Sequence, residues 1–394
     1  MIATLAAVIP TRNRSSLAIE AVRALLDQDC ELEIFVSDNS TSADEPLRQF
    51  CEAAPRVQYL RPSAERSAAS HWDWAVREVL ARSQATHVAV LHDRNRIKPR
   101  QWGALQSIAT QHPDTVITFG IDSIHDTPPP LRLWQMPWTG KLFRQQTARA
   151  AAMIAAARIA EALHALPTLA NSVVPRAVLT SIVDRFGNLC DSTSPDLAFL
   201  SRFLALHDTW LHADRSIGIL HAANRSSGRG YLRGAGGDFP DFVELHGDRP
   251  WLDAAPLPGL NLGYNMLLHE YELVRRETGD RLPSLDRRAS LESLASALQW
   301  VQSPEARASM RAALAMEGCV ANSVPFVPDR TWRNDVRETM TLLAARWLGR
   351  APEHITAFAF KSDEQALRAA LRHPRRAQSL ADHMIALEAV EVGS

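Results

Sequence analysis

Short apolar runs alternate with amphipathic stretches along residues 4–119 of the chain. Four of the runs predict buried strands, at residues 4–9, 32–36, 57–60 and 87–91. Between them, apolar side chains recur every three or four positions, which predicts helices that begin at Ser15 and that cover residues 44–51 and 67–81. A helix beginning at Pro99 and a strand at 115–119 continue the alternation. We therefore expect a largely parallel sheet covered by helices.

The pattern changes after residue 122. Residues 122–146 contain a proline triplet and the tryptophans Trp134 and Trp138, and they predict a long irregular segment. The Ala-rich run at 147–166 predicts a helix, and the charged residues within it favour a soluble helix over a membrane span.

No strand pattern follows residue 239, whereas several later segments have helical periodicity. These segments are residues 291–301, 306–316, 332–348 and 364–371. The chain is long enough for two folding units. We therefore expect a first domain at residues 1–238 and a helical C-terminal domain at residues 239–394.

The composition is that of a globular protein and excludes few functions. The chain has 394 residues, of which 46% are hydrophobic and 22% charged, and its formal net charge is -1. Proteins that bind nucleic acid usually carry a basic surface, so we expect no nucleic-acid partner. The four cysteines follow neither a disulfide nor a metal-ligand spacing, and the N-terminus has no secretory pattern, so we expect a cytoplasmic protein.

Polar residues follow each of the first four predicted strands. They occupy residues 10–14, 37–41, 61–66 and 92–96. In parallel sheets, ligands bind at the carboxyl ends of the strands. We therefore expect a binding site formed by these four segments.

Three of the segments together resemble the inverting glycosyltransferases of family 2, which have the GT-A fold. They read Pro-Thr-Arg-Asn-Arg at 10–14, Ser-Asp-Asn-Ser-Thr at 37–41 and His-Asp-Arg-Asn at 92–95. The resemblance extends to about Arg229. It implies an α/β fold with a GT-A-type nucleotide-binding sheet, mixed but mostly parallel and flanked by helices, which the helical C-terminal domain follows.

The resemblance assigns the nucleotide half of a donor site to the first two segments. The turn after the first strand would meet the nucleobase through Pro10, Thr11, Asn13 and Arg14. Asp38 would hold the base and the ribose, because a carboxylate accepts hydrogen bonds from a uracil N–H or from ribose hydroxyls. The alternative for Asp38 is an ordinary turn with an Asx cap.

The helix before the fourth strand adds His71 to the donor-binding set, at a position where relatives usually carry Asn. The neighbouring Trp72 would lie against the donor sugar or its phosphates. A helical aromatic residue is also a common core residue, and that alternative stays open for Trp72.

The phosphate half of the site departs from the family. Relatives carry an acidic DxD motif that binds a divalent ion, whereas only Asp93 is acidic here. The resemblance makes Asp93 and His221 the metal ligands and donor contacts, and the reduced motif weakens the case for a Mn²⁺ or Mg²⁺ cofactor without removing it. Arg94, Arg96 and Lys98 are cations that offer another way to stabilise the leaving group, or they form a solvated edge.

His221 and the glycine-dense residues 227–237 have structural alternatives as well. A single His in an apolar setting is often a structural residue. Arg229 is assigned to donor binding, in a loop that would close over the diphosphate. The alternative for the loop is an interdomain linker.

Asp196 is the candidate catalytic residue. The segment Ser-Pro-Asp at 194–196 matches a Pro-Asp pair that a subset of the family places under the acceptor site. The resemblance makes Asp196 the general base that takes the proton of the acceptor hydroxyl, a role that needs a raised pKa. Ser-Pro-Asp before an apolar helix is also a capping signature, which is the structural alternative.

The resemblance to family 2 implies a bacterial-type glycosyltransferase that moves a sugar, with inversion, from a nucleotide donor to a glycan or lipid-linked acceptor. The UDP-sugar donor and the role in polysaccharide biosynthesis are likewise what the resemblance implies. A non-catalytic sugar-nucleotide-binding member of the family is the first alternative. A sugar nucleotidylyltransferase is the second, although the turn at 10–14 lacks the glycines that such enzymes carry there.

A membrane surface is a further candidate partner. Trp134 and Trp138 suit an acceptor sugar or a lipid interface, and burial is their alternative. The basic residues Arg372, His373, Arg375 and Arg376 suit anionic lipid at the inner face of the membrane, or they form an ordinary solvated surface.

Overall fold

The structure is a computed structural model. It describes residues 2–43, 45–125, 131–134, 138–158, 165–221, 226, 245, 252–260, 262–279, 281–298, 301, 304–319 and 359–360. None of the helices in these ranges is long and apolar enough to cross a membrane.

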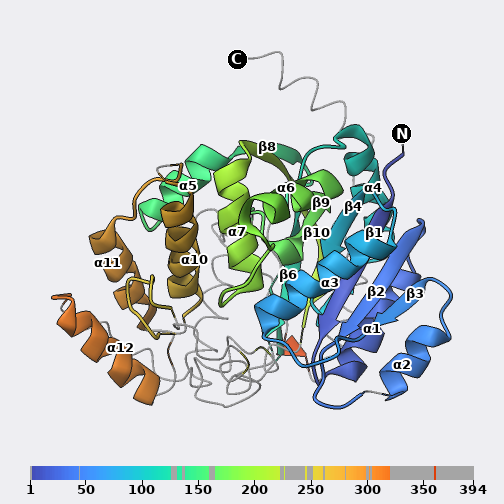
Figure 1. Ribbon diagram of the computed structural model, residues 1–394, viewed down its shortest axis with the longest axis horizontal. Helices are drawn as coiled ribbons and strands as arrows, with labels where there is room; N and C mark the ends of the chain where they lie inside the picture. Colours follow the sequence, from blue (N-terminus) through green and yellow to red (C-terminus); the bar gives the residue numbers. More distant parts are fainter. Residues whose placement is uncertain are drawn as a thin grey trace, which may run out of the picture.

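One mixed sheet forms the centre of the molecule (Figure 1). Its strands run in the order β3 (Val57–Leu60), β2 (Leu32–Asp38), β1 (Leu5–Thr11), β4 (His87–Val90), β9 (Ser172–Pro175) and β6 (Ile117–His125). Strands β1 to β4 are mutually parallel, and β9 is antiparallel to both β4 and β6. Most strands therefore point the same way, as the sequence predicted.

The remaining strands extend the sheet beyond β6. They are β5 (Asn95–Ile97), β7 (Leu131–Trp134), β8 (Leu142–Gln146), β10 (Thr209–Leu220) and β11 (Ala359–Phe360). Strand β10 is parallel to β6 and antiparallel to β5 and β8, and β7 pairs with β6 and β11. The pairing of β10 with β5 brings a late segment of the chain beside the residues that follow β4.

Helices cover both faces of the sheet. They are α1 (Ser15–Leu26), α2 (Glu45–Glu52), α3 (Ala68–Arg82), α4 (Gln101–Gln111), α5 (Thr147–Ala155), α6 (Arg176–Phe186), α7 (Pro195–Leu206), α10 (Gly263–Thr278), α11 (Arg287–Ala297) and α12 (Pro304–Met316). The predicted fold class, a mixed and mostly parallel sheet flanked by helices, is confirmed.

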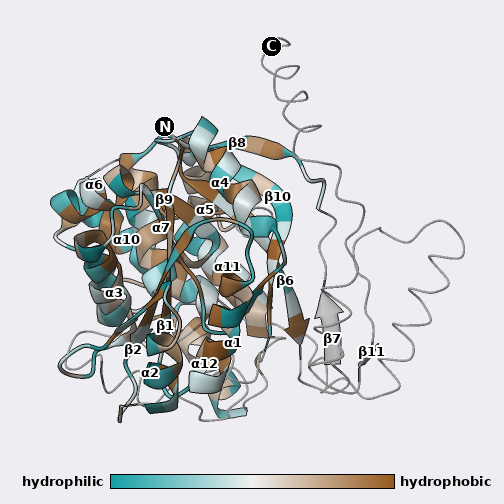
Figure 2. Cartoon of the chain, turned by 90° about the vertical axis from the view of Figure 1, so that its right-hand side faces the viewer, coloured by the Kyte–Doolittle hydropathy of each residue, from teal (hydrophilic) through white to brown (hydrophobic). Residues whose placement is uncertain are grey.

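The apolar side chains of the sheet divide into two cores because successive strand residues point to opposite faces. In β1, Ala6 and Val8 join the core formed with α3, α5, α6, α7 and α10. Leu5, Ala7 and Ile9 join the core formed with α1, α2 and α4. Figure 2 shows hydrophobic residues in the strands and hydrophilic ones on outer helices such as α3.

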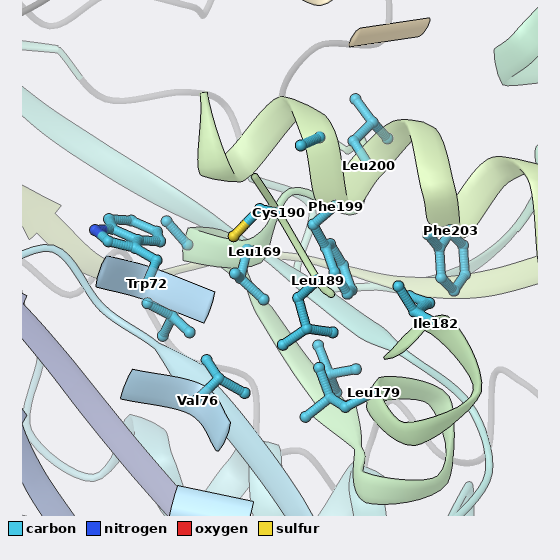
Figure 3. Close-up of a cluster of buried hydrophobic side chains, with 14 of the residues drawn as sticks. Trp72, Val76, Leu169, Leu179, Ile182, Leu189, Cys190, Phe199, Leu200 and Phe203 are labelled. Atoms are coloured by element: carbon cyan, nitrogen blue, oxygen red, sulfur yellow. The ribbon is translucent and has the colours of Figure 1, made fainter. Parts of the chain in front are cut away.

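The first of these cores holds α3 and α7 against each other. Figure 3 shows Trp72 and Val76 of α3 facing Cys190 and Leu189, with Phe199 and Phe203 of α7 behind them. Large side chains that are fully buried fix the position of a helix, because interiors are close-packed. The core therefore fixes the first turn of α7, where Asp196 lies, relative to α3.

The segment at 122–146 was predicted to be irregular, and that prediction is wrong for its described parts. Strand β6 continues to residue 125, and β7 and β8 follow. The prolines and tryptophans obscured the strand pattern. Strand β7 pairs with the preceding β6, whereas β8 pairs with the distant β10.

Two helix predictions are also corrected. The helix expected from Pro99 begins at Gln101, because Arg100 has a left-handed φ of 60°. The helix expected at 147–166 ends at Ala155, where Ala157 has a φ of 60° and the Arg158 N–H donates to the Met153 carbonyl. A left-handed residue of this kind is a common way to end a helix.

The C-terminal part has the predicted helices at α11 and α12, which share a small core with residues 257–262. Helix α10 instead packs on α7, and its Leu267, Leu268 and Tyr271 belong to a core of the sheet. Strand β11 corrects the expectation of no strand after residue 239. The predicted helices at 332–348 and 364–371 lie outside the described residues, and the domain boundary at 238 stays a prediction.

Candidate functional site

The turn after β1 contacts the segment after β4. The Thr11 hydroxyl donates to Oδ2 of Asp93 over 2.8 Å, and Arg14 Nε lies 2.9 Å from the same oxygen. Asp93 is 1% exposed. The parallel pairing of β1 with β4 brings these residues together, so the structure unites the predicted nucleobase turn with the predicted phosphate segment.

The same turn is also fixed to the segment after β2. The Asn13 N–H donates to the Ser40 hydroxyl over 2.8 Å, and Asn13 Oδ1 accepts from the Thr41 N–H over 3.1 Å. Asn13 has a φ of 54°, a left-handed conformation that asparagine tolerates better than most residues. Pro10, which precedes the turn, is buried and lies opposite Ser37 in the ladder between β1 and β2.

Asp38, the last residue of β2, is fully buried and has hydrogen bonds on both carboxylate oxygens. Oδ1 accepts from the N–H and the hydroxyl of Ser40. Oδ2 accepts from the Tyr59 hydroxyl over 2.7 Å and from the Arg61 guanidinium over 3.0 Å. The Asx turn that was the structural alternative therefore exists, and it coexists with a position at the base of a pocket.

This pocket is a depression of about 250 Å³ between the segments after β2 and β3. Its lining residues are Asp38, Asn39, Ser40, Thr41, Arg61, Pro62, Ser63, Ala64 and Glu65. The side-chain amide of Asn39 makes two hydrogen bonds to the backbone of Arg66. Its Nδ2 donates to the Arg66 carbonyl, and its Oδ1 accepts from the Arg66 N–H. The pocket is small and polar, and it contains the buried Asp38 carboxylate and the partly exposed Arg61 guanidinium.

His71 supports this pocket from behind. Its Nε2 is 2.7 Å from the Ser37 hydroxyl, and the side chain is buried. Burial lowers the pKa of His71 to about 3, so its ring is neutral near neutral pH. Trp72, one position further along α3, belongs to the core and meets the ring of His92 edge-on at 5.2 Å, which fits the core alternative.

Asp196 is brought to the end of β4 by the packing of α7. Its Oδ1 accepts the Ala170 N–H over 2.8 Å, and its Oδ2 is 3.6 Å from Nε2 of His92, the neighbour of Asp93. Burial raises the pKa of Asp196 to about 6, although the Ala170 N–H counteracts part of the rise. Burial, with Arg94 and Arg14 nearby, lowers the pKa of His92 to about 3, so His92 offers Asp196 no positive charge.

The loop before α7 is held by a residue that sequence reasoning missed. Glu270 of α10 accepts hydrogen bonds on Oε1 from the N–H and the hydroxyl of Thr193 and from the Ser194 N–H. Its neighbour His269 bonds the Ser192 hydroxyl through Nε2 at 3.1 Å. The Ser194 side chain makes no capping hydrogen bond, which the capping alternative required. The N–H groups of Thr193 and Ser194 are instead bound by Glu270.

Arg94, Arg96 and His221 lie together where β10 meets β5. The His221 N–H donates to the Arg94 carbonyl over 3.2 Å, and the Arg94 guanidinium donates to the His221 carbonyl over 3.3 Å. Burial, followed by the charges of Arg96 and Arg94, lowers the pKa of His221 to about 3. Arg96 pairs with Glu20 of α1, and burial lowers the pKa of Arg96 to about 10.

Lys98 is directed to a different part of the site. Its ammonium group donates to Asp122 Oδ2 over 2.7 Å and to the Ser216 hydroxyl over 2.8 Å. Oδ1 of Asp122 accepts the indole N–H of Trp138 over 2.8 Å, and the Trp138 ring covers Gly120 closely enough to leave no room for a Cβ atom there. Trp138 is half-buried, whereas the side chain of Trp134 lies outside what the structure describes.

Part of the sequence matches the model of a known protein family. Residues 6–159 match the family model described as "Glycosyl transferase family 2". Residues 6–159 form a family 2 glycosyltransferase domain. The sequence-based assignment to this family, and to a transferase, is therefore confirmed for the segment that contains Thr11, Arg14, Asp38 and Asp93.

Comparisons of the whole chain give weaker likenesses. A search of curated proteins finds no match. A crystal structure of S. aureus TarS 1-349 has 13% identity and a TM-score of 0.43, covering 78% of this chain and 83% of that chain. TarS 1-349 in complex with UDP-GlcNAc has 14% identity, a TM-score of 0.43 and the same coverage. The complex with UDP has 12% identity and a TM-score of 0.42, covering 91% and 97%.

Asp196 and His221 lie beyond the matched segment of the glycosyltransferase domain, yet both meet the end of β4 that it contains. Within the described residues, no three His, Cys, Asp or Glu side chains are grouped so that they could hold a metal ion. Arg229 and the predicted loop at 227–237 lie outside the described residues, as do the basic residues at 372–376.

Proposed function

We propose that this chain transfers a sugar from a UDP-sugar donor to a hydroxyl of a glycan or lipid-linked acceptor, with inversion at the anomeric carbon and with Asp196 as general base. The observation that carries the proposal is the 3.6 Å separation of Asp196 Oδ2 from His92 Nε2. It brings a carboxylate with a raised pKa to the end of β4, beside Asp93, where the proposal has the donor diphosphate bind.

The pocket around Asp38 suits the nucleoside half of the donor. The Asp38 carboxylate is already held by Tyr59, Arg61 and Ser40, so its orientation is fixed before any ligand arrives. Preorganised polar groups bind a ligand without a further ordering cost. Arg61 also donates to the Ser40 carbonyl, and both residues line the pocket. Uracil and ribose present the N–H and hydroxyl groups that such a rim can bind.

The two carboxylate oxygens of Asp196 have different contacts and different roles in the proposed mechanism. The Ala170 N–H holds Oδ1, while Oδ2 faces His92 and the partly exposed side of the residue. As the acceptor oxygen forms its bond to the anomeric carbon, the acceptor proton passes to Oδ2. The bond from the anomeric carbon to the donor phosphate breaks, and its electron pair leaves with the phosphate oxygen. A carboxylate pKa of about 6 suits proton uptake near neutral pH.

A turnover assay tests the proposal with a matched pair of variants. Asp196→Asn keeps an oxygen for the Ala170 N–H but removes the base, and we expect donor turnover to fall by roughly 10²–10⁴-fold with UDP binding unchanged. Asp191→Asn changes a carboxylate on the same loop that pairs with Arg202, and we expect near-normal turnover. UDP binding without any turnover across a broad set of donors and acceptors supports the non-catalytic alternative and contradicts the proposal.

A further inference from the structure

The carboxylate of Asp93 already has a cationic partner within the protein. Arg14, the residue before α1, places Nε 2.9 Å from Asp93 Oδ2, and the Thr11 hydroxyl donates to the same oxygen. Both contacts come from the turn after β1, which is itself fixed to Ser40 and Thr41. At this oxygen, the guanidinium of Arg14 therefore supplies a positive charge of the kind that a divalent ion would bring.

The surroundings of Asp93 add positive charge instead of further ligands for a cation. Arg94 and Arg96 follow it in sequence and are 8% and 7% exposed. His92, on the other side, places its Nε2 3.6 Å from Oδ2 of Asp196. Divalent ions of this kind prefer several carboxylate and carbonyl oxygens, and like charges nearby oppose their binding. The described residues at this position do not fit a divalent metal ion.

The neighbouring His221 suits an anion better than a cation. Its side chain is buried, and the Arg94 guanidinium donates to its backbone carbonyl over 3.3 Å, so a positive charge lies nearby and would disfavour an adjacent metal ion. Its Nε2 is buried and has no hydrogen-bond partner among the described residues. A neutral imidazole can donate one hydrogen bond to a phosphate oxygen, and a buried polar atom gains from such a partner.

We infer that this site binds and neutralises the diphosphate of its donor without a divalent metal ion, with the guanidinium of Arg14 on Asp93 in place of the ion. The inference rests on the proposed function, because it concerns the diphosphate of the same donor. Arg94 and His221 supply the neighbouring positive charge and hydrogen-bond donor. Fixed cations stabilise a leaving diphosphate by the same electrostatic principle as a bound metal.

Titration calorimetry with UDP tests the inference on the full chain. Binding is measured in EDTA and in excess Mn²⁺ for the wild type, for Arg14→Met and for Arg23→Met. Arg23 is the matched control, because it lies on α1, the helix that follows Arg14, is exposed and contacts Phe50. Thermal unfolding of each variant shows whether it is folded. If Arg14→Met does not fold, the pair of wild-type titrations decides alone.

We expect the wild type and Arg23→Met to bind UDP equally well in EDTA and in Mn²⁺, within about twofold. Arg14→Met should bind roughly tenfold more weakly in EDTA, and Mn²⁺ should restore part of the affinity because the Asp93 carboxylate, without the Arg14 guanidinium, can now accept the ion. Wild-type binding that is tenfold tighter in Mn²⁺, or Arg14→Met binding unchanged in EDTA, overturns the inference and leaves the proposed function standing. Absence of wild-type UDP binding in both conditions contradicts the proposed function itself.

Discussion

Asp196 Oδ2 lies 3.6 Å from Nε2 of His92. His92 lies within residues 6–159, which match the family 2 model, whereas Asp196 lies beyond them. Neither group carries the charge that would make the contact an ion pair near pH 5, because burial raises one pKa to about 6 and lowers the other to about 3. The contact therefore does not neutralise Asp196. It leaves a carboxylate that can take up a proton at the edge of the donor site.

The first prediction concerns the pH dependence of transfer. A base must be deprotonated to act, so kcat/KM should rise with pH and level off above a midpoint near the Asp196 pKa of about 6. Initial rates at saturating acceptor and low donor measure this limb. His92→Gln is the control, since His92 does not titrate in this range and the limb should persist. A rate that stays constant from about pH 5 to pH 7 contradicts the role of Asp196.

The second prediction concerns stability. The folded pKa of about 6 exceeds the unfolded value of about 3.9, so the folded state binds the proton more tightly and loses stability as pH rises between these values. Asp196→Asn removes this loss. We expect its free energy of unfolding to exceed that of the wild type by about 3 kcal/mol at pH 8 and to match it at pH 4.

Denaturant titrations at the two pH values measure the difference. Asp191→Asn should show no such gain at pH 8, because the Asp191 side chain is 46% exposed and pairs with Arg202. Equal unfolding free energies for wild type and Asp196→Asn at pH 8 would mean that Asp196 is not held at a desolvation cost.

The third prediction concerns the support of α7 by α10. Glu270→Ala leaves the Thr193 and Ser194 donors without their acceptor, which should reduce the free energy of unfolding by about 2–4 kcal/mol. Glu277→Ala, at the exposed end of the same helix, removes a surface pair with Arg185 and should cost less than about 1 kcal/mol. Chemical denaturation compares the two. Similar losses in both variants would show that Glu270 does not hold this loop.

The fourth prediction concerns the nucleoside pocket. Arg61→Met removes the guanidinium that holds Asp38 Oδ2 and the Ser40 carbonyl, so UDP affinity should fall roughly tenfold, or about 1.4 kcal/mol. Arg48→Met is the control, because Arg48 pairs with the exposed Glu45 and Glu52 of α2, away from the pocket lining. Calorimetry measures both affinities. Unchanged binding by Arg61→Met places the nucleoside elsewhere.

Elements whose burial is encoded locally were predictable from the sequence. Strands β1 to β4 and helices α1 to α3 lie within a few residues of their predicted positions, because each carries an apolar face with its own period. Strands β7, β8 and β11 were not predictable, since each is short, and β8 and β11 are paired only by segments distant in sequence. The end of α5 depends on the left-handed conformation of Ala157. Alanine rarely adopts this conformation, so the sequence contains no signal for the helix end.

The residues of the candidate site also fall into those that the sequence indicated and those whose contacts required the structure. The resemblance to family 2 identified Asp38, Asp93 and Asp196 one by one from their positions after strands or before a helix. It did not show that Arg14 pairs with Asp93, because that contact depends on the register of β1 against β4. Glu270 has no motif of its own, and its role appears only when α10 packs against α7. The contacts made by distant segments required the structure.

A crystal structure of the full chain soaked with UDP and Mn²⁺ tests the central claim most directly. Our account predicts the uracil and ribose at the pocket lined by Asp38 and Arg61, and the diphosphate directed toward Arg14 and Asp93 with no Mn²⁺ on the Asp93 carboxylate. A nucleotide bound away from Asp38 would contradict the account.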